Sequence, residues 1–146
     1  MKLILVFLPL VLAAAVVQGS DLASVIIAME RAALDRSDRG DASGFLEISA
    51  PDVTYFDPFL DEPIRGLPAL RTYYAGFPNE RGSGEMLDPL VQVAGDVAVL
   101  TFHYVIKFEK NGQVSRWNTT EVYERRKEGW RIIHTHWSFR KPAVAE

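Results

Sequence analysis

Cysteine is absent from the 146-residue sequence, which excludes disulfide bonds, thiolate metal sites and a catalytic thiol. Long runs of lysine or arginine are also absent, and 16 basic residues against 19 acidic residues give a formal net charge of −3. Nucleic-acid-binding proteins usually present a basic face. The composition therefore argues against a nucleic-acid partner.

An uninterrupted apolar run occurs at the N-terminus. Lys2 precedes it, residues 3–17 form it, and Gln18-Gly19-Ser20 follow. The run is short for a helix that crosses a bilayer, which needs about 20 apolar residues. A basic start, a brief apolar stretch and small residues before a polar segment are typical of a secretory signal peptide. We therefore expect a signal peptide over residues 1–19 and one secreted or periplasmic domain over residues 20–146 with no further membrane contact; an uncleaved anchor is the alternative.

The first half of the expected domain has helical patterns. Apolar residues from Leu22 to Ala33 recur at helical spacing, and Gly40 can end this helix in a left-handed conformation. The remaining elements expected before residue 85 are a short helix through Phe45 and Ile48, a short strand over Val53–Asp57, a helix over Leu67–Phe77 and a polar loop over Asn79–Gly84.

The second half has strand patterns separated by turn residues. Gly95-Asp96 and Asn111-Gly112 suit two-residue hairpin turns, and Pro89 indicates an edge strand or a bulge. Helices followed by antiparallel strands predict an α+β domain with the helices against one face of the sheet. The expected strands are Met86–Ala94, Val97–Lys110, Gln113–Arg126 and Gly129–Arg140.

The turn at Asn111-Gly112 predicts which side chains face one another across the central hairpin. A two-residue loop there places Phe102 opposite Glu121 and Tyr104 opposite Thr119. Side chains alternate between the two faces of a strand, so these four residues share one face. The aromatic residues on that face, Trp117 among them, indicate that it is the covered one.

The last turn leaves two registers open. A two-residue turn at Lys127-Glu128 places Glu121 opposite His134, whereas a turn one residue longer places Glu121 opposite Thr135. The first register is favoured because it sets Ile132 on the covered face.

The favoured register predicts a carboxylate beside an imidazole among aromatic rings. Burial raises the pKa of Glu121 and a charged His134 lowers it, so the pair could hold a proton near neutral pH and serve in acid–base catalysis. A structural ion pair is the alternative. With His136, the pair also forms a two-histidine, one-carboxylate set, but histidines about 7 Å apart along a strand suit a shared metal poorly. We therefore expect no metal site and no cofactor.

Several segments together resemble the nuclear transport factor 2-like superfamily, and the resemblance is closest to SnoaL-like and DUF4440 domains and to the association domain of calcium/calmodulin-dependent protein kinase II. The resemblance covers nearly all of residues 22–140. It rests on the order and spacing of residues 52–58, 64–67, 71–74, 120–126, 129–131 and 134–138.

This resemblance implies a cone-shaped, strongly curved antiparallel sheet wrapped around N-terminal helices, with an internal pocket and a homodimer formed through the sheet. Tyr55 and Asp57 lie where the first strand of the family approaches the mouth of the pocket, although Asp57 could equally form a turn before Pro58. The arginine cluster of the kinase association domain falls on Arg71, Tyr104 and Glu121 here, so one of the three arginines is retained.

These observations lead to one hypothesis and one alternative. The hypothesis is an exported domain that binds a small apolar or weakly polar molecule and acts as a cofactor-independent isomerase, dehydratase or cyclase, with Glu121 as base and His134 orienting it. Arg71 and Tyr104 would stabilise negative charge on the substrate. The alternative is a non-catalytic dimerisation or ligand-binding module. The residues expected to contact the ligand are Tyr55, Asp57, Arg71, Tyr104, Trp117, Thr119 and His136.

Overall fold

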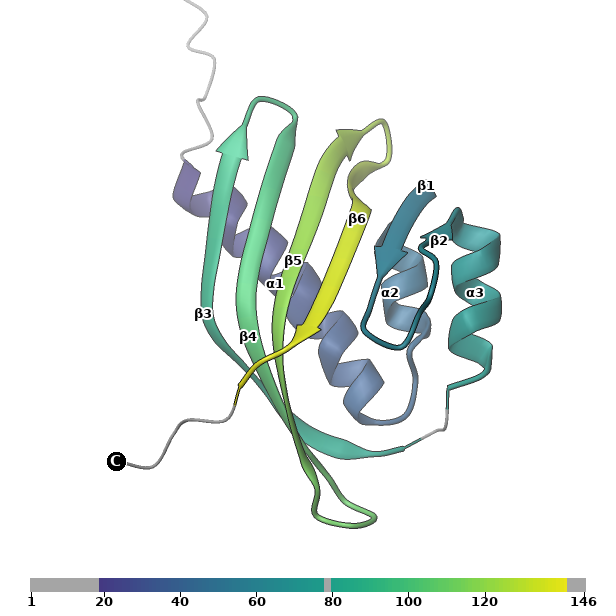
Figure 1. The fold of residues 1–146 in the computed structure, drawn as a ribbon. Coiled ribbons are helices and arrows are strands. Elements are labelled where there is room, and N and C mark those ends of the chain that lie inside the picture. The colour runs from purple at the N-terminus through teal and green to yellow at the C-terminus, as the bar shows by residue number, and fades with distance from the viewer. Residues whose placement is uncertain (1–18, 78–79, 142–146) are drawn as a thin grey trace, which may run out of the picture.

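The computed structural model describes residues 19–77 and 80–141, so the expected signal peptide lies almost entirely outside the described residues. Three helices precede the long strands of the sheet (Figure 1). No helix in the described part of the chain is long and apolar enough to cross a membrane. The elements are α1 (Gly19–Asp38), α2 (Ser43–Ile48), β1 (Ser49–Phe56), β2 (Ile64–Arg65), α3 (Leu67–Ala75), β3 (Gly82–Ala94), β4 (Val97–Phe108), β5 (Val114–Arg126) and β6 (Gly129–Phe139).

The helices form where the sequence predicts them. After α1, Gly40 has a φ of 86°, the left-handed conformation that ends a helix at low cost for glycine. The Asp41 carboxylate then accepts a 3.0 Å hydrogen bond from the Ser43 backbone N–H at the start of α2. This bond satisfies one of the N–H groups that have no partner within the helix.

The six strands form one sheet in the order β2-β1-β6-β5-β4-β3. Four of the neighbouring pairs are antiparallel, but β1 runs parallel to β6. The expectation of a wholly antiparallel sheet is therefore wrong at this pair. No hairpin joins β1 to β6, so no tight turn forces them to run in opposite directions.

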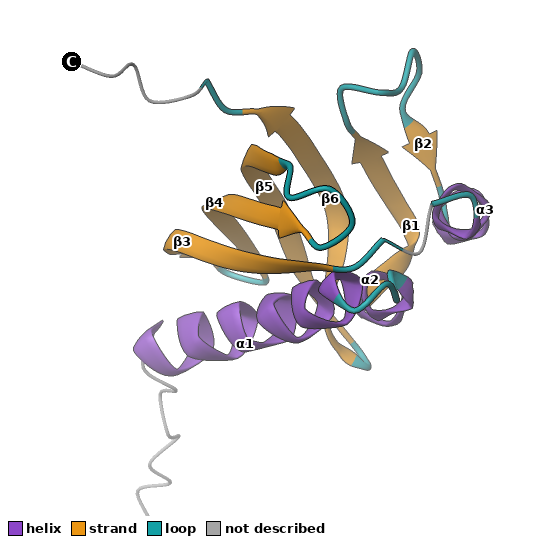
Figure 2. Ribbon diagram, turned by 90° about the horizontal axis from the view of Figure 1, so that it is seen from below, coloured by secondary structure: helices purple, strands orange, loops and turns teal. Residues whose placement is uncertain are grey.

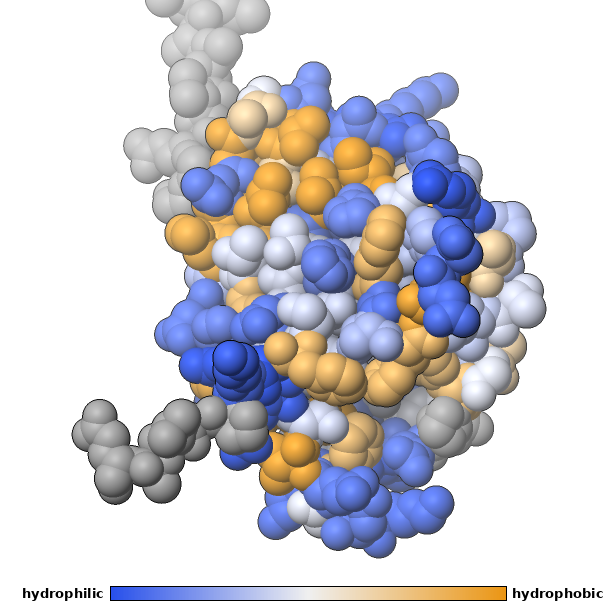
Figure 3. Space-filling model, in the orientation of Figure 1, coloured by the Kyte–Doolittle hydropathy of each residue, from blue (hydrophilic) through white to orange (hydrophobic). Residues whose placement is uncertain are grey.

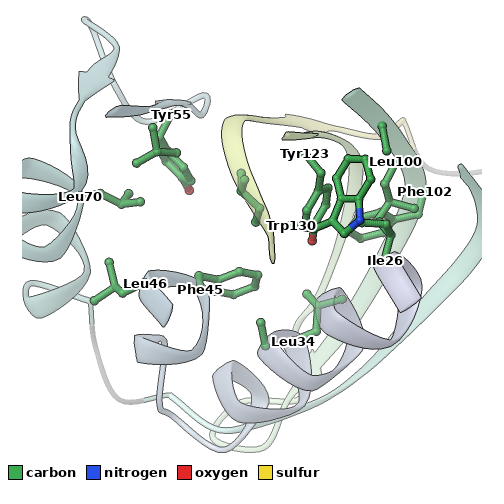
Figure 4. Packing of buried hydrophobic residues seen from close by; sticks show 14 of the residues in the cluster. Ile26, Leu34, Phe45, Leu46, Tyr55, Leu70, Leu100, Phe102, Tyr123 and Trp130 are labelled. Atoms are coloured by element: carbon green, nitrogen blue, oxygen red, sulfur yellow. The ribbon is translucent and has the colours of Figure 1, made fainter. Parts of the chain in front are cut away.

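The helices cover one face of this curved sheet, which we call the inner face; the other is the outer face. Figure 2 shows α1 running along the inner face beneath β3–β5, whereas α3 lies beside β1 and β2. Buried side chains from α1, α2, α3 and β1 point across this space toward those of the long strands (Figure 4). The core residues that Figure 4 labels are Ile26, Leu34, Phe45, Leu46, Tyr55, Leu70, Leu100, Phe102, Tyr123 and Trp130.

The central hairpin, β4–β5, is shifted from the predicted register. Tyr104 lies opposite Trp117 and Phe102 opposite Thr119, because the loop is longer than the two residues Asn111-Gly112. The Phe108 N–H bonds the Gln113 carbonyl at 2.9 Å, which leaves a four-residue loop between them. Because the shift is by two residues, the predicted inner-face side chains remain on the inner face.

The β5–β6 hairpin contains both of the registers that the sequence left open. Near the turn Tyr123 lies opposite Ile132, as a two-residue turn requires, but a bulge follows and places Glu121 opposite Thr135. The extra residue moves every later side chain of β6 to the other face. The prediction that His134 faces Glu121 is therefore wrong, and His134 lies on the outer face opposite Val122.

Strand β3 lies at the edge of the sheet and begins earlier than expected. Its register shifts between Leu87 and Leu90, around Pro89, and Gly95-Asp96 forms the predicted tight turn with a φ of 62° at Gly95. The segment Gly82–Gly84, expected to be part of a loop, is already strand. The side chains of β4 explain this, as described below.

Candidate functional site

A cavity of about 560 Å³ lies between the inner face of the sheet and the helices. Its wall is dominated by aromatic rings contributed by α2, α3, β1, β4, β5, β6 and the segments that follow β1 and α3. None of the described residues that line it is basic. The lining residues are Leu34, Ser37, Gly40, Ala42, Phe45, Tyr55, Asp57, Phe59, Tyr73, Tyr74, Phe77, Glu80, Tyr104, Ile106, Phe108, Trp117 and Trp137.

Asp57 presents a carboxylate to this cavity at the end of β1. It accepts hydrogen bonds from the Tyr73 hydroxyl at 2.5 Å, the Tyr55 hydroxyl at 3.1 Å and the Phe59 backbone N–H at 2.7 Å. Burial and the neighbouring carboxylate raise the pKa of both tyrosines, so both hydroxyls keep their protons and act as donors. A bond from an aspartate side chain to the backbone N–H two residues later is typical of a turn-forming aspartate. Asp57 therefore both forms the turn before Pro58 and contacts the cavity.

The positions of these groups follow from simple periodicities. Tyr55 and Asp57 are two residues apart and therefore point to the same face as β1 ends. Leu70, Tyr73 and Tyr74 of α3 recur at helical spacing and share the side that faces the sheet, and Phe77 follows just after the helix end. We did not predict Tyr73 and Tyr74 as site residues, although this spacing was visible in the sequence.

Two carboxyl groups, Glu30 of α1 and Glu121 of β5, are fully buried. Glu30 accepts a 2.5 Å hydrogen bond from the Tyr123 hydroxyl, and Glu121 accepts a 2.6 Å hydrogen bond from the Thr135 hydroxyl. The remaining oxygen of each carboxyl has no hydrogen-bond partner among the described residues.

The environment of this pair favours its protonated forms. Burial raises the pKa of Glu30 from 4.5 to about 7, and burial together with the charge of Glu30 raises the pKa of Glu121 well above its usual value. Two adjacent carboxylates in a low-dielectric interior cannot both ionise at low cost. The pair therefore holds at least one proton at neutral pH.

Tyr74 connects the carboxyl pair with the cavity. It lines the cavity, its ring packs edge-on against Tyr55 with the centroids 5.8 Å apart, and its pKa is raised by burial and by the charges of Glu121 and Glu30. A chain of polar groups thus extends from Asp57 through Tyr55 and Tyr74 toward the buried pair. Glu121 itself does not line the cavity.

Four of the predicted ligand contacts, Tyr55, Asp57, Tyr104 and Trp117, line the cavity, and the other three do not. Thr119 is buried on the inner face outside the cavity wall. Arg71 is exposed because it lies on the side of α3 that faces away from the sheet, and His136 is exposed on the outer face. The Tyr104 hydroxyl donates to Asp38, so the role we predicted for Tyr104 and Arg71 in stabilising substrate charge does not fit the geometry.

The histidines of β6 take part in a different cluster on the outer face. His134 Nδ1 lies 2.8 Å from the Thr54 hydroxyl, and the Phe56 ring contacts both His134 and His136. Burial and the neighbouring His136 lower the pKa of His134. The two-histidine, one-carboxylate set does not form because Glu121 lies on the inner face, and the described residues contain no group of three or more His, Asp or Glu side chains placed to bind a metal ion.

A curved sheet with helices against its inner face and a cavity between them defines the nuclear transport factor 2-like class. Within this class, residues 23–141 match the calcium/calmodulin dependent protein kinase II association domain, and the chain belongs to that family. A search of curated proteins finds no match.

Solved structures agree with this assignment. A candidate ketosteroid isomerase of Parabacteroides distasonis is 43% identical, with 84% of this chain and 91% of that chain covered and a TM-score of 0.71. The hub homology domain of the Chlamydomonas reinhardtii kinase is 23% identical over 82% and 98% of the two chains, with a TM-score of 0.70. A nuclear transport factor 2-like protein of unknown function from Pseudomonas putida is 21% identical over 85% and 90%, with a TM-score of 0.74.

Proposed function

We propose that the cavity binds a small, apolar or weakly polar molecule that carries no negative charge. Its volume of about 560 Å³ is within the range typical of small-molecule sites, and its wall is mainly aromatic. Asp57 and Glu80 are its acidic groups and no described basic side chain lines it, so an anionic ligand would be repelled. Aromatic walls with one fixed polar group are typical of sites that orient an apolar ligand.

We further propose cofactor-independent proton transfer of the isomerase, dehydratase or cyclase type, with Asp57 as the catalytic base. The observation that carries this proposal is the Asp57 carboxylate, fixed by three donors at the wall of an aromatic cavity. In an isomerisation, the carboxylate takes a proton from a carbon beside a carbonyl group and returns it to a second carbon. A ketosteroid, named in the description of the Parabacteroides relative, is an apolar carbonyl compound of this class.

The test is an isomerisation assay with the Asp57→Asn variant. The substrate is a β,γ-unsaturated ketosteroid, and the absorbance of the conjugated product reports turnover. Loss of a general base typically lowers the rate by about 100-fold or more. The matched control is Asp61→Asn, because Asp61 is an exposed aspartate of the loop that follows. Equal turnover by the wild type and Asp57→Asn would contradict the assignment.

The alternative function is a non-catalytic module that associates with copies of itself through the outer face of the sheet. The structural relatives named as hub and association domains favour this alternative. Apolar residues gather on the outer face over the upper parts of the long strands, and Leu90 is 56% exposed there (Figure 3). Light scattering should then report a dimer for the wild type and a monomer for Val99→Asp, because Val99 lies on this face between Gln92 of β3 and Val122 of β5. A monomeric wild type would refute this interface.

We also propose export to the periplasm or the extracellular space, on the evidence of the N-terminal sequence pattern. N-terminal sequencing of the mature protein should then begin at Ser20. Recovery of the full chain with Met1 from the membrane fraction would instead support an uncleaved anchor.

A further inference from the structure

A second cavity of about 250 Å³ adjoins the main cavity near the C-terminal end of α1. Leu34 and Tyr104 line both cavities, so their side chains form the wall that separates them. The two spaces differ in character, because charged groups replace aromatic rings in the second one. Its lining residues are Arg31, Leu34, Asp35, Asp38, Gly84, Glu85, Met86 and Tyr104.

The Tyr104 side chain is held in this wall at its far end. Its hydroxyl donates a short hydrogen bond to one carboxylate oxygen of Asp38, and the Gly84 backbone N–H donates to the other at 2.8 Å. The ring also packs edge-on against Trp137, with the ring centroids 6.0 Å apart. Tyr104 therefore presents its ring to the main cavity, while its hydroxyl is occupied on the side of the second cavity.

This position of Tyr104 requires a glycine in the edge strand. A Cβ atom at Gly84 would lie 1.8 Å from the Tyr104 hydroxyl oxygen and 2.4 Å from Cζ, far inside contact distance. Gly82, two residues earlier on the same face, leaves similar room for Ile106. The two glycines let Tyr104 and Ile106 of β4 lie close against the β3 backbone, and Tyr104 thereby reaches Asp38 of α1. This close packing explains why a glycine-containing segment forms a strand here.

We propose that Tyr104, held by Asp38 and Gly84, is a specificity-determining residue that limits the length of the ligand in the main cavity. The part of this inference that concerns ligands rests on the proposed function, whereas the wall between the cavities does not. A ligand that extended past Tyr104 would need a polar end to match Arg31 and the acids beyond it. The wall therefore selects compact apolar molecules over longer amphiphiles.

Crystal structures test the wall directly. In Tyr104→Ala the two cavities should join into one continuous space, and in Gly84→Ala the displaced ring should open the same passage. Gly76→Ala is the matched control, because a Cβ there would meet only the Tyr73 carbonyl oxygen at an ordinary 3.4 Å. If Gly84→Ala does not fold, Asp38→Ala removes the hydrogen bond and keeps the ring. Cavities that remain separate in Tyr104→Ala would overturn the proposal.

Titration calorimetry with straight-chain primary alcohols from butanol to dodecanol tests the consequence for ligands. Affinity should rise about fourfold for each added methylene while the chain still fits. In the wild type and in Gly76→Ala the rise should stop at a shorter chain than in Tyr104→Ala. The same limiting length in all proteins would refute the role in specificity. If no alcohol binds to any protein although the crystal structures show a joined cavity, the proposed function fails while the wall stands.

Discussion

Thr135 donates a 2.6 Å hydrogen bond from its hydroxyl to the buried carboxyl of Glu121, and both side chains lie on the inner face of the sheet. The second oxygen of the Glu121 carboxyl has no hydrogen-bond partner among the described residues, so the bond from Thr135 is the one that satisfies this buried group. The free energy of unfolding should therefore depend strongly on it.

We predict that Thr135→Val lowers the free energy of unfolding by about 2 kcal/mol, because a buried acid then loses its donor. Urea denaturation monitored by circular dichroism measures the effect. Thr120→Val, on the outer face of β5, serves as the control and should change stability little. A loss of equal size in both variants would show that the effect belongs to threonine in this sheet and not to the bond with Glu121.

Glu30→Gln should change how stability depends on pH. The unfolded side chain ionises near 4.5, whereas burial raises the pKa of folded Glu30 to about 7. The unfolded state therefore releases its proton first, and the wild type loses stability as pH rises from 4.5 to 7. The part of this loss that Glu30 contributes is of the order of 3 kcal/mol and should be absent in Glu30→Gln, in which Glu121 still contributes its own pH dependence.

Denaturation midpoints measured across this pH range test the prediction, with Glu128→Gln in the exposed β5–β6 turn as the control. Parallel pH profiles for the wild type and Glu30→Gln would contradict it.

Two neighbouring positions on α3 should respond differently to substitution. Tyr73→Phe removes a hydroxyl that donates at 2.5 Å to the Asp57 carboxylate, so it should lower turnover or ligand affinity about tenfold. Arg71→Ala, two residues earlier on the exposed side, should leave both unchanged. Steady-state kinetics or calorimetry measures the two variants. A larger effect at Arg71 would restore the anion-binding role that the arginine cluster of the kinase domain suggested.

His134 should destabilise the fold in acid. Burial and His136 lower its pKa below the ordinary 6.5, so as pH falls through this range the unfolded state binds a proton before the folded state does. The wild type should therefore lose stability below pH 6.5 relative to His134→Gln. Thermal melts at several pH values measure this, with His103→Gln on the same face as a comparison.

Much of the fold could be predicted because its determinants are local. Glycine at Gly40 and Gly95 permits the left-handed backbone that ends a helix or turns a hairpin, and the period of two assigns faces along each strand. The prediction of which β4 and β5 side chains face inward is therefore confirmed, although the register between the two strands is shifted by two residues. The parallel pairing of β1 with β6 could not be predicted in this way, because it joins segments about 80 residues apart and no turn specifies it.

The site depended much more on the tertiary structure. The amino-acid sequence determined that Tyr55 and Asp57 share a face and that Glu121 points inward. The bulge in β6, by contrast, decided that Thr135 and not His134 reaches that carboxyl, because one extra residue reverses every later side chain and no local preference marks it. The partnership of Glu121 with Glu30 likewise exists only because α1 packs across the sheet, which brings two acids from distant segments into one buried space.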